Sequence, residues 1–185
     1  MRRILEKRYW ILFLAFIFLA GAALAAYGFV PVMKIDGKTI TFSEYLKAYS
    51  AIKSYDRISR RAATPSEEIK RLALGVLVEN RFLDTLSERT SSDFKKEAER
   101  LVEESVKTTP NLSLGEASKK IYGLNEADFK KLVLLPQAKR DLLTKHYEYN
   151  PAELETLWND LAKNAQIKIY YPGYEWKDGE VKIKK

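Results

Sequence analysis

The stretch TPSEEIKRLALGVLVENRFLDTLSER, residues 64–89, decides the fold predicted for this chain. It opens with the pattern of a capping box, in which the Thr64 hydroxyl accepts the Glu67 amide and Pro65 takes the first helical position. The apolar residues that follow recur at helical spacing in two rows on roughly opposite sides. The first row contains Ile69, Leu72, Ala73, Val76, Leu77, Leu83 and Leu86, and the second contains Leu74, Val78 and Phe82.

A helix that is apolar on nearly all sides is normally surrounded by other elements. We therefore predict that residues 64–89 form the central helix of a helical bundle, with both rows in its core. The alternative interpretation is that the second row faces a groove that another molecule fills.

The composition is that of a globular protein. The chain has 185 residues, of which 46% are apolar, which is enough for one domain and an appendage. It has no cysteine, which excludes a disulfide framework, a thiolate nucleophile and a cysteine zinc site. The net charge is +7, and four cations against Glu6 place +3 of it in the first eight residues. The rest is dispersed, so we expect no nucleic-acid partner.

The N-terminal region has the pattern of a membrane anchor. Residues 9–33 contain no charged side chain, and residues 9–30 as a helix would span roughly 33 Å, enough to cross a hydrocarbon core. The preceding cations predict a single pass through a bacterial inner membrane, with the N-terminus in the cytoplasm and the domain facing the periplasm or cell exterior. A cleaved signal peptide is the competing interpretation, because Ala23-Leu24-Ala25 matches a cleavage site. Both interpretations export residues 34–185.

The exported part is predicted to be mainly α-helical, with small β-hairpins formed by its two ends. Asp36-Gly37 and Asp178-Gly179 each separate short strand-like runs, as in two-residue hairpins. Capping patterns at Thr41, Ser113, Asn125 and Asn150 each begin a helix. A further helix is expected to begin at Thr90 or Ser91, and one helix should run from residue 125 to about 148 with a kink at Pro136. Residues 165–171 alternate as a strand that we expect to pair with the first hairpin.

Three features, in this order and spacing, resemble the N-terminal domain of SurA-type periplasmic chaperones and their PpiD-like and PrsA-like foldase relatives. The first is the hairpin KIDGKTIT at residues 34–41, and the second is the apolar helix carrying Leu77, Val78, Phe82, Leu83 and Leu86. The third is the run from residue 112 to 131, which includes YGLNEADFKK at residues 122–131. The resemblance covers residues 33–147, and residues 151–171 are similar to the helix that completes the family's chaperone module.

The resemblance implies an ATP-independent chaperone that holds unfolded or nascent exported polypeptides without catalysing a reaction. Members of the family usually carry a parvulin-type prolyl isomerase domain before the last helix. Here Tyr147-Glu148-Tyr149-Asn150-Pro151 joins the flanking helices directly, so isomerase activity is not carried over. The implied parts are a basic stub and anchor or signal peptide at 1–31, a SurA-N-like helical domain at 32–171 and a C-terminal hairpin or tail at 172–185.

The sequence offers no pattern typical of an enzyme. Phosphate-loop, dinucleotide-binding, nucleophile-elbow and zinc-protease motifs do not occur in it. His146 is the only histidine, and we interpret it as structural or exposed. We therefore expect no catalytic residue, no cofactor and no metal.

A chaperone surface should be apolar and tolerant of sequence, because burial of apolar area needs no fixed hydrogen bonds. The candidate peptide-binding residues are Tyr45, Tyr49, Leu74, Val78, Phe82, Leu134 and Leu135. Two alternatives remain open: the chain is a membrane-tethered scaffold for one fixed partner, or it forms a homo-oligomer through its aromatic C-terminal region.

Intact-mass measurement of the membrane fraction separates the two interpretations of the N-terminus. An anchor predicts the mass of the uncleaved chain, because nothing is removed from it. A mature form beginning near Ala26 would instead establish a cleaved signal peptide.

Overall fold

The computed structural model describes residues 29–59, 64–108 and 113–184. Residues 9–28 of the predicted membrane segment lie outside these ranges, and so does most of the predicted stub and anchor. Within the described ranges, no helix combines the length and apolar character needed to cross a bilayer.

The described chain is mainly helical with short strands near both ends, as the sequence predicts. The helices are α2 (Phe42–Ser59), α3 (Ser66–Thr90), α4 (Phe94–Lys107), α5 (Leu114–Tyr122), α6 (Glu126–Phe129), α7 (Leu135–His146) and α8 (Pro151–Asn164), and a π-helical segment η1 (Lys130–Leu134) joins α6 to α7. The strands are β1 (Pro31–Ile35), β2 (Lys38–Thr41), β3 (Ile167–Ile169), β4 (Tyr174–Lys177) and β5 (Glu180–Ile183).

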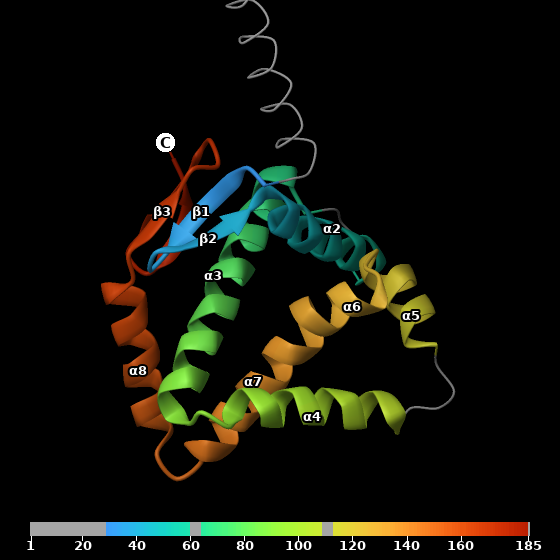
Figure 1. Ribbon diagram of the computed structural model, residues 1–185. Coiled ribbons are helices and arrows are strands. Elements are labelled where there is room, and N and C mark those ends of the chain that lie inside the picture. The colour runs from blue at the N-terminus through green and yellow to red at the C-terminus, as the bar shows by residue number, and fades with distance from the viewer. Residues whose placement is uncertain (1–28, 60–63, 109–112, 185) are drawn as a thin grey trace, which may run out of the picture.

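Helix α3 is the centre of this arrangement (Figure 1). The strands lie at its N-terminal end, α4 crosses near its C-terminal end, and α8 runs along one side. Helices α2, α3 and α7 form the three sides of a triangle, with α6 leading from α5 into α7. Every one of α2, α4, α7, α8 and β5 packs against α3.

The strands bring the two ends of the described chain together. β1 lies between β2 and β3 and is antiparallel to both, with Met33 opposite Ile40 on one side and Ile169 on the other. At the β1–β2 turn, Asp36 and Gly37 have φ values of 46° and 82°, as a type I′ turn requires. The Asp36 amide donates to the Gln166 carbonyl at 3.0 Å, which fixes the start of β3 beside this turn. The predicted pairing of a late strand with the first hairpin is therefore confirmed.

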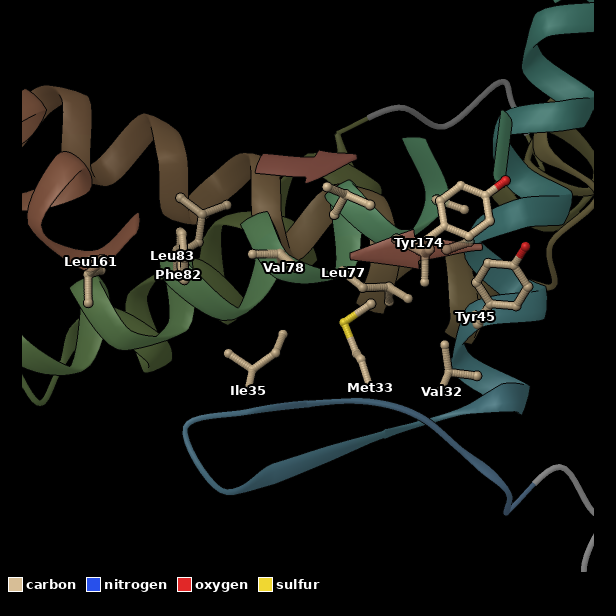
Figure 2. Close-up of a cluster of buried hydrophobic side chains, with 14 of the residues drawn as sticks. Val32, Met33, Ile35, Tyr45, Leu77, Val78, Phe82, Leu83, Leu161 and Tyr174 are labelled. Carbon is tan, nitrogen blue, oxygen red and sulfur yellow. The ribbon is translucent and has the colours of Figure 1, made fainter. Parts of the chain in front are cut away.

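Most residues of the two apolar rows of α3 are buried. Figure 2 shows Leu77, Val78, Phe82 and Leu83 of α3 between the first hairpin and the C-terminal elements. Leu74 is 0% exposed and Val78 and Phe82 are each 2% exposed, so the interpretation of the second row as core is confirmed. In the first row, Leu72 and Val76 are only half-buried, and the interpretation as core holds for the other residues.

The first hairpin contributes two consecutive residues to this core. Val32 and Met33 are both buried, although neighbouring residues of a regular strand point to opposite faces. The register between β1 and β2 shifts between Pro31 and Met33, which is a bulge-like irregularity that turns both side chains inward. Figure 2 shows Val32, Met33 and Ile35 extending from the hairpin toward α3.

The predicted cap at Thr41 is confirmed, but the one at Thr64 is wrong. The Thr41 amide donates to Glu44 Oε2 at 2.9 Å, and the Glu44 amide donates to Thr41 Oγ1 at 3.3 Å. Thr64 instead donates its hydroxyl to Oδ1 of Asp56, at 2.5 Å, and its amide to Oδ2, at 3.1 Å. Asp56 accepts from the Thr64 amide, the role that Glu67 has in a capping box, and Glu67 accepts from Lys70 and Tyr174 instead. Thr64 therefore joins α3 to the end of α2 and does not cap its own helix.

The helix predicted from residue 125 to about 148 is divided by a wider turn. In η1 the Leu135 amide donates to the Lys130 carbonyl, five residues earlier. Pro136 has no amide hydrogen and its ring would crowd the Leu132 carbonyl, so the wider turn accommodates the proline within a continuous helical path. The helix expected from Thr90 or Ser91 begins later, at Phe94, because α3 itself extends to Thr90.

The burial of α3 predicts how the fold responds to truncation of a leucine. Leu74→Ala removes a fully buried side chain, so we expect a loss of about 2 to 5 kcal/mol in the free energy of unfolding, measured by urea denaturation. Leu46→Ala is the matched control, because Leu46 is 44% exposed on α2, and it should lose less than about 0.5 kcal/mol. Equal losses for the two variants would contradict a core centred on α3.

Candidate functional site

Three grooves lie along α3 in the described part of the chain. The lateral groove has a volume of about 360 Å³ and lies between α3, α7 and α8. Its floor and walls are mostly apolar, and the polar side chains belong to its rim. It is lined by Glu79, Leu83, Leu86, Arg140, Leu143, Thr144, Pro151, Leu154, Glu155 and Trp158.

Trp158 joins the lateral groove to a second hollow, the tryptophan groove. This groove has a volume of about 250 Å³ between α3, α8 and the β4–β5 hairpin. Phe82 forms part of its floor, and the edges of Trp158 and Trp176 pack against that ring at centroid distances of 5.6 and 6.0 Å. Leu72, Gly75, Val76 and Val78 supply the α3 wall.

Gly75 has no side chain, so it leaves space in the wall of the tryptophan groove. A Cβ atom added at Gly75 would meet no atom within 4 Å. Glycine in a helix interior lowers helix stability by about 1 kcal/mol relative to alanine. At this position that loss accompanies a groove that no side chain fills. Glu79 and Trp158 line both grooves, so the two hollows adjoin.

The central groove lies on the other side of α3 and combines charged and polar side chains with an apolar wall. It has a volume of about 400 Å³ and is lined by Ile40, Glu44, Leu77, Asn80, Arg81, Asp84, Ser87, Glu88, Lys95, Lys131, Leu132, Leu135, Pro136 and Lys139. Lys139 is only 7% exposed, and its ammonium forms a short ion pair with Asp84. Arg81 donates to the other oxygen of the same carboxylate at 3.3 Å.

The seven candidate peptide-binding residues do not converge on one groove. Tyr45, Tyr49, Leu74, Val78 and Phe82 all belong to the main core or pack against it. Within that group, Val78 and Phe82 also line the tryptophan groove. Leu135 lines the central groove, and Leu134 packs on a smaller cluster around Leu124 and Phe129.

Most polar side chains of the central groove were not predicted from the sequence, although their spacing indicates that they share a helix face. Leu132, Pro136, Lys139 and Leu143 are spaced as one face of a helix, so a lysine occurs inside an apolar stripe. On α3, Asn80, Asp84 and Ser87 form a polar stripe at helical spacing within an apolar helix. Leu132, Pro136 and Lys139 lie across the central groove from the polar stripe of α3, whereas Leu143 lines the lateral groove. Leu154 and Trp158 are half-buried beside the lateral groove.

Tyrosines cluster where α2 meets the C-terminal strands. The rings of Tyr45 and Tyr171 have centroids 4.7 Å apart, and those of Tyr171 and Tyr174 are 5.7 Å apart. Burial, together with a hydrogen bond to Tyr171, raises the pKa of Tyr45 well above its ordinary value. Burial and the hydrogen bond to Glu67 do the same for the pKa of Tyr174, whose hydroxyl lies 2.7 Å from Glu67 Oε2. The hydrogen bond from Tyr174 to Glu67 joins β4 to the start of α3.

His146 is exposed and stacks edge-on against Phe94 and Tyr147. Across the described ranges, no group of three histidine or acidic side chains lies close enough to bind a metal ion.

Comparison with known proteins gives no relative for this chain. No family model, no curated protein and no solved structure matches it.

The tyrosine cluster predicts a loss of stability in alkali. Above about pH 10 an unfolded tyrosine ionises, whereas the raised pKa keeps folded Tyr45 and Tyr174 neutral. The unfolded state then binds fewer protons than the folded state, so the free energy of unfolding should fall as pH rises above 10. In Tyr45→Phe this decline should be shallower, as measured by urea denaturation from pH 8 to 11.5.

Tyr149→Phe is the control for that measurement. Tyr149 is 95% exposed, so removal of its hydroxyl should leave the alkaline slope unchanged. Parallel slopes for Tyr45→Phe and the unmodified chain would contradict the assignment.

Proposed function

We propose that this chain is a membrane-anchored, extracytoplasmic, ATP-independent chaperone that holds unfolded exported polypeptides and has no prolyl isomerase activity. The observation that carries the proposal is the pair of adjoining, mostly apolar grooves, lateral and tryptophan, that meet at Trp158. The resemblance of residues 33–147 to SurA-type N-terminal domains supports the same function.

The lining of the lateral groove favours a ligand recognised by apolar area. Leu83, Leu86 and Leu143 are buried at its floor, with Leu154 and Trp158 half-buried at its side. Two of its charged side chains, Glu79 and Arg140, pair with each other at the rim. A groove whose floor is apolar accepts many side chains, because an apolar floor imposes no fixed hydrogen-bond pattern.

The size of the two grooves favours weak and reversible binding. Full burial of one large apolar side chain contributes about 1.5 to 3 kcal/mol, and association loses at least about 4 kcal/mol of translational and rotational freedom. Two adjoining grooves therefore bind a few apolar side chains with modest affinity. A chaperone that releases its client without ATP requires such binding.

The chain order favours a site near the membrane surface. The apolar N-terminal stretch reaches Val30, and β1 begins at Pro31. If residues 9–30 are an anchor, no linker separates the bilayer from the domain. The grooves would then meet exported chains soon after they emerge from the membrane.

A leucine at Gly75 tests the proposal without altering the core. The new side chain should fill the tryptophan groove, because a Cβ there meets nothing within 4 Å, and leucine favours a helix over glycine by nearly 1 kcal/mol. The assay is suppression of aggregation when a urea-unfolded outer-membrane polypeptide is diluted into excess full-length chain. We expect suppression by the unmodified chain and, for Gly75→Leu, an affinity lower by roughly tenfold.

Ser50→Leu is the matched control, since it adds the same side chain at an exposed position of α2. It should suppress aggregation as well as the unmodified chain. An unmodified chain that gives no suppression at several-fold molar excess removes the proposal. A pull-down dominated by one folded species would favour the alternative, a scaffold with one fixed partner.

A further inference from the structure

The central groove contains hydrogen-bond donors with unused capacity. Lys139 is buried, and its ammonium has three N–H groups, of which one donates to Asp84 Oδ1 and the others have no acceptor among the described residues. The Ser87 hydroxyl is buried and has no hydrogen-bond partner within the described part of the chain. The Asn80 side chain, one turn of α3 from Asp84, lines the same groove. Buried donors without partners lower the stability of a fold, so their retention at one groove requires an explanation.

Two of the three carboxylates that line the groove are already engaged. Asp84 accepts from Lys139 with one oxygen and from Arg81 with the other. Glu44 Oε2 accepts from Thr41, and its Oε1 lies 3.8 Å from the Lys131 ammonium. The third, Glu88, is exposed to solvent. The unused hydrogen-bonding capacity of Lys139 and Ser87 is that of donors, and its complement is an anionic acceptor.

The backbone of the groove wall is also unusual. Lys131 and Leu132 belong to the π-helical segment η1, which ends two residues before Pro136. Such wide turns are rare and recur at functional sites. Here the turn presents a cation and an apolar side chain to the same hollow. The groove thus combines cations, unpartnered polar groups and an apolar wall formed by Ile40, Leu77, Leu132, Leu135 and Pro136.

We propose that the central groove binds a carboxylate carried by an apolar segment of a polypeptide. The carboxylate accepts from Lys139 and Ser87, and the neighbouring apolar side chain packs on Leu132 and Leu135. Choosing a polypeptide as the ligand rests on the proposed chaperone function, whereas the preference for a carboxylate rests on the groove alone. The carboxylate is either a chain end or an acidic side chain next to an apolar residue.

Calorimetric titration of the full-length chain in lipid nanodiscs tests this inference. The probes are N-acetyl-leucyl-phenylalanine as the free acid, the same peptide as its carboxamide, and N-acetyl-leucyl-glutamate carboxamide, with empty nanodiscs as the blank. We expect the free acid to bind about tenfold more tightly than its carboxamide, because a charge-assisted hydrogen bond is lost in the amide. Recovery of that affinity by the glutamate peptide would show that the site accepts an acidic side chain as well as a chain end, and its absence would assign the site to chain ends.

Ser87→Ala separates a binding role from a structural one. If the hydroxyl serves binding, the variant should lose roughly fivefold in affinity for the acid while its thermal midpoint stays equal or rises, since an unpaired buried hydroxyl has been removed. Thr85→Ala is the matched control, because it removes a hydroxyl of α3 that bonds the Arg81 carbonyl and does not line the groove. It should leave affinity for the acid unchanged. Lys139→Met should abolish the preference for the acid where the variant folds.

The two proposals fail separately. Equal affinity for the acid and both carboxamides, or an unchanged affinity in Ser87→Ala, would overturn the carboxylate site even if the chain still suppresses aggregation. Conversely, loss of aggregation suppression in Gly75→Leu with an intact preference for the acid would confine the two activities to separate faces of α3.

Discussion

The fold depends on the burial of one helix from nearly every direction. Helix α3 is too apolar to be exposed to water, and no single neighbour covers it, so α2, α7, α8 and the C-terminal hairpin must all pack against it. Each neighbour meets α3 at a different angle, and their junctions leave hollows between them. The three grooves are therefore consequences of how one helix is covered, and all of them have a wall on α3.

The element order was predictable because local signals agree with the packing. Residues close together in the sequence are enough to predict the two Asp-Gly turns, the Thr41 capping box and the helical spacing of the apolar residues. The Thr64 cap was predicted wrongly because the competing partner, Asp56, is eight residues away on another helix. Such a competition is decided by tertiary contacts, which a local motif does not contain.

The candidate site was harder to predict than the fold. Apolar periodicity identifies which side chains face inward, but it does not identify the junctions that remain unfilled. Val78 and Phe82 were chosen from such a pattern and are buried, yet they lie at the edge of a groove because Gly75 leaves space beside them. The buried Lys139 breaks an apolar stripe, and that type of irregularity is a better guide to a polar site than the stripe itself.

The position of β3 has a consequence for the order in which the domain assembles during synthesis. β1 is made early, but its partner β3 follows 130 residues later in the chain, at the Asp36–Gln166 contact. The central strand therefore keeps one edge open until almost the entire polypeptide has been made. A nascent molecule at that stage exposes an unpaired strand edge, so correct assembly depends on how promptly its own last segment arrives.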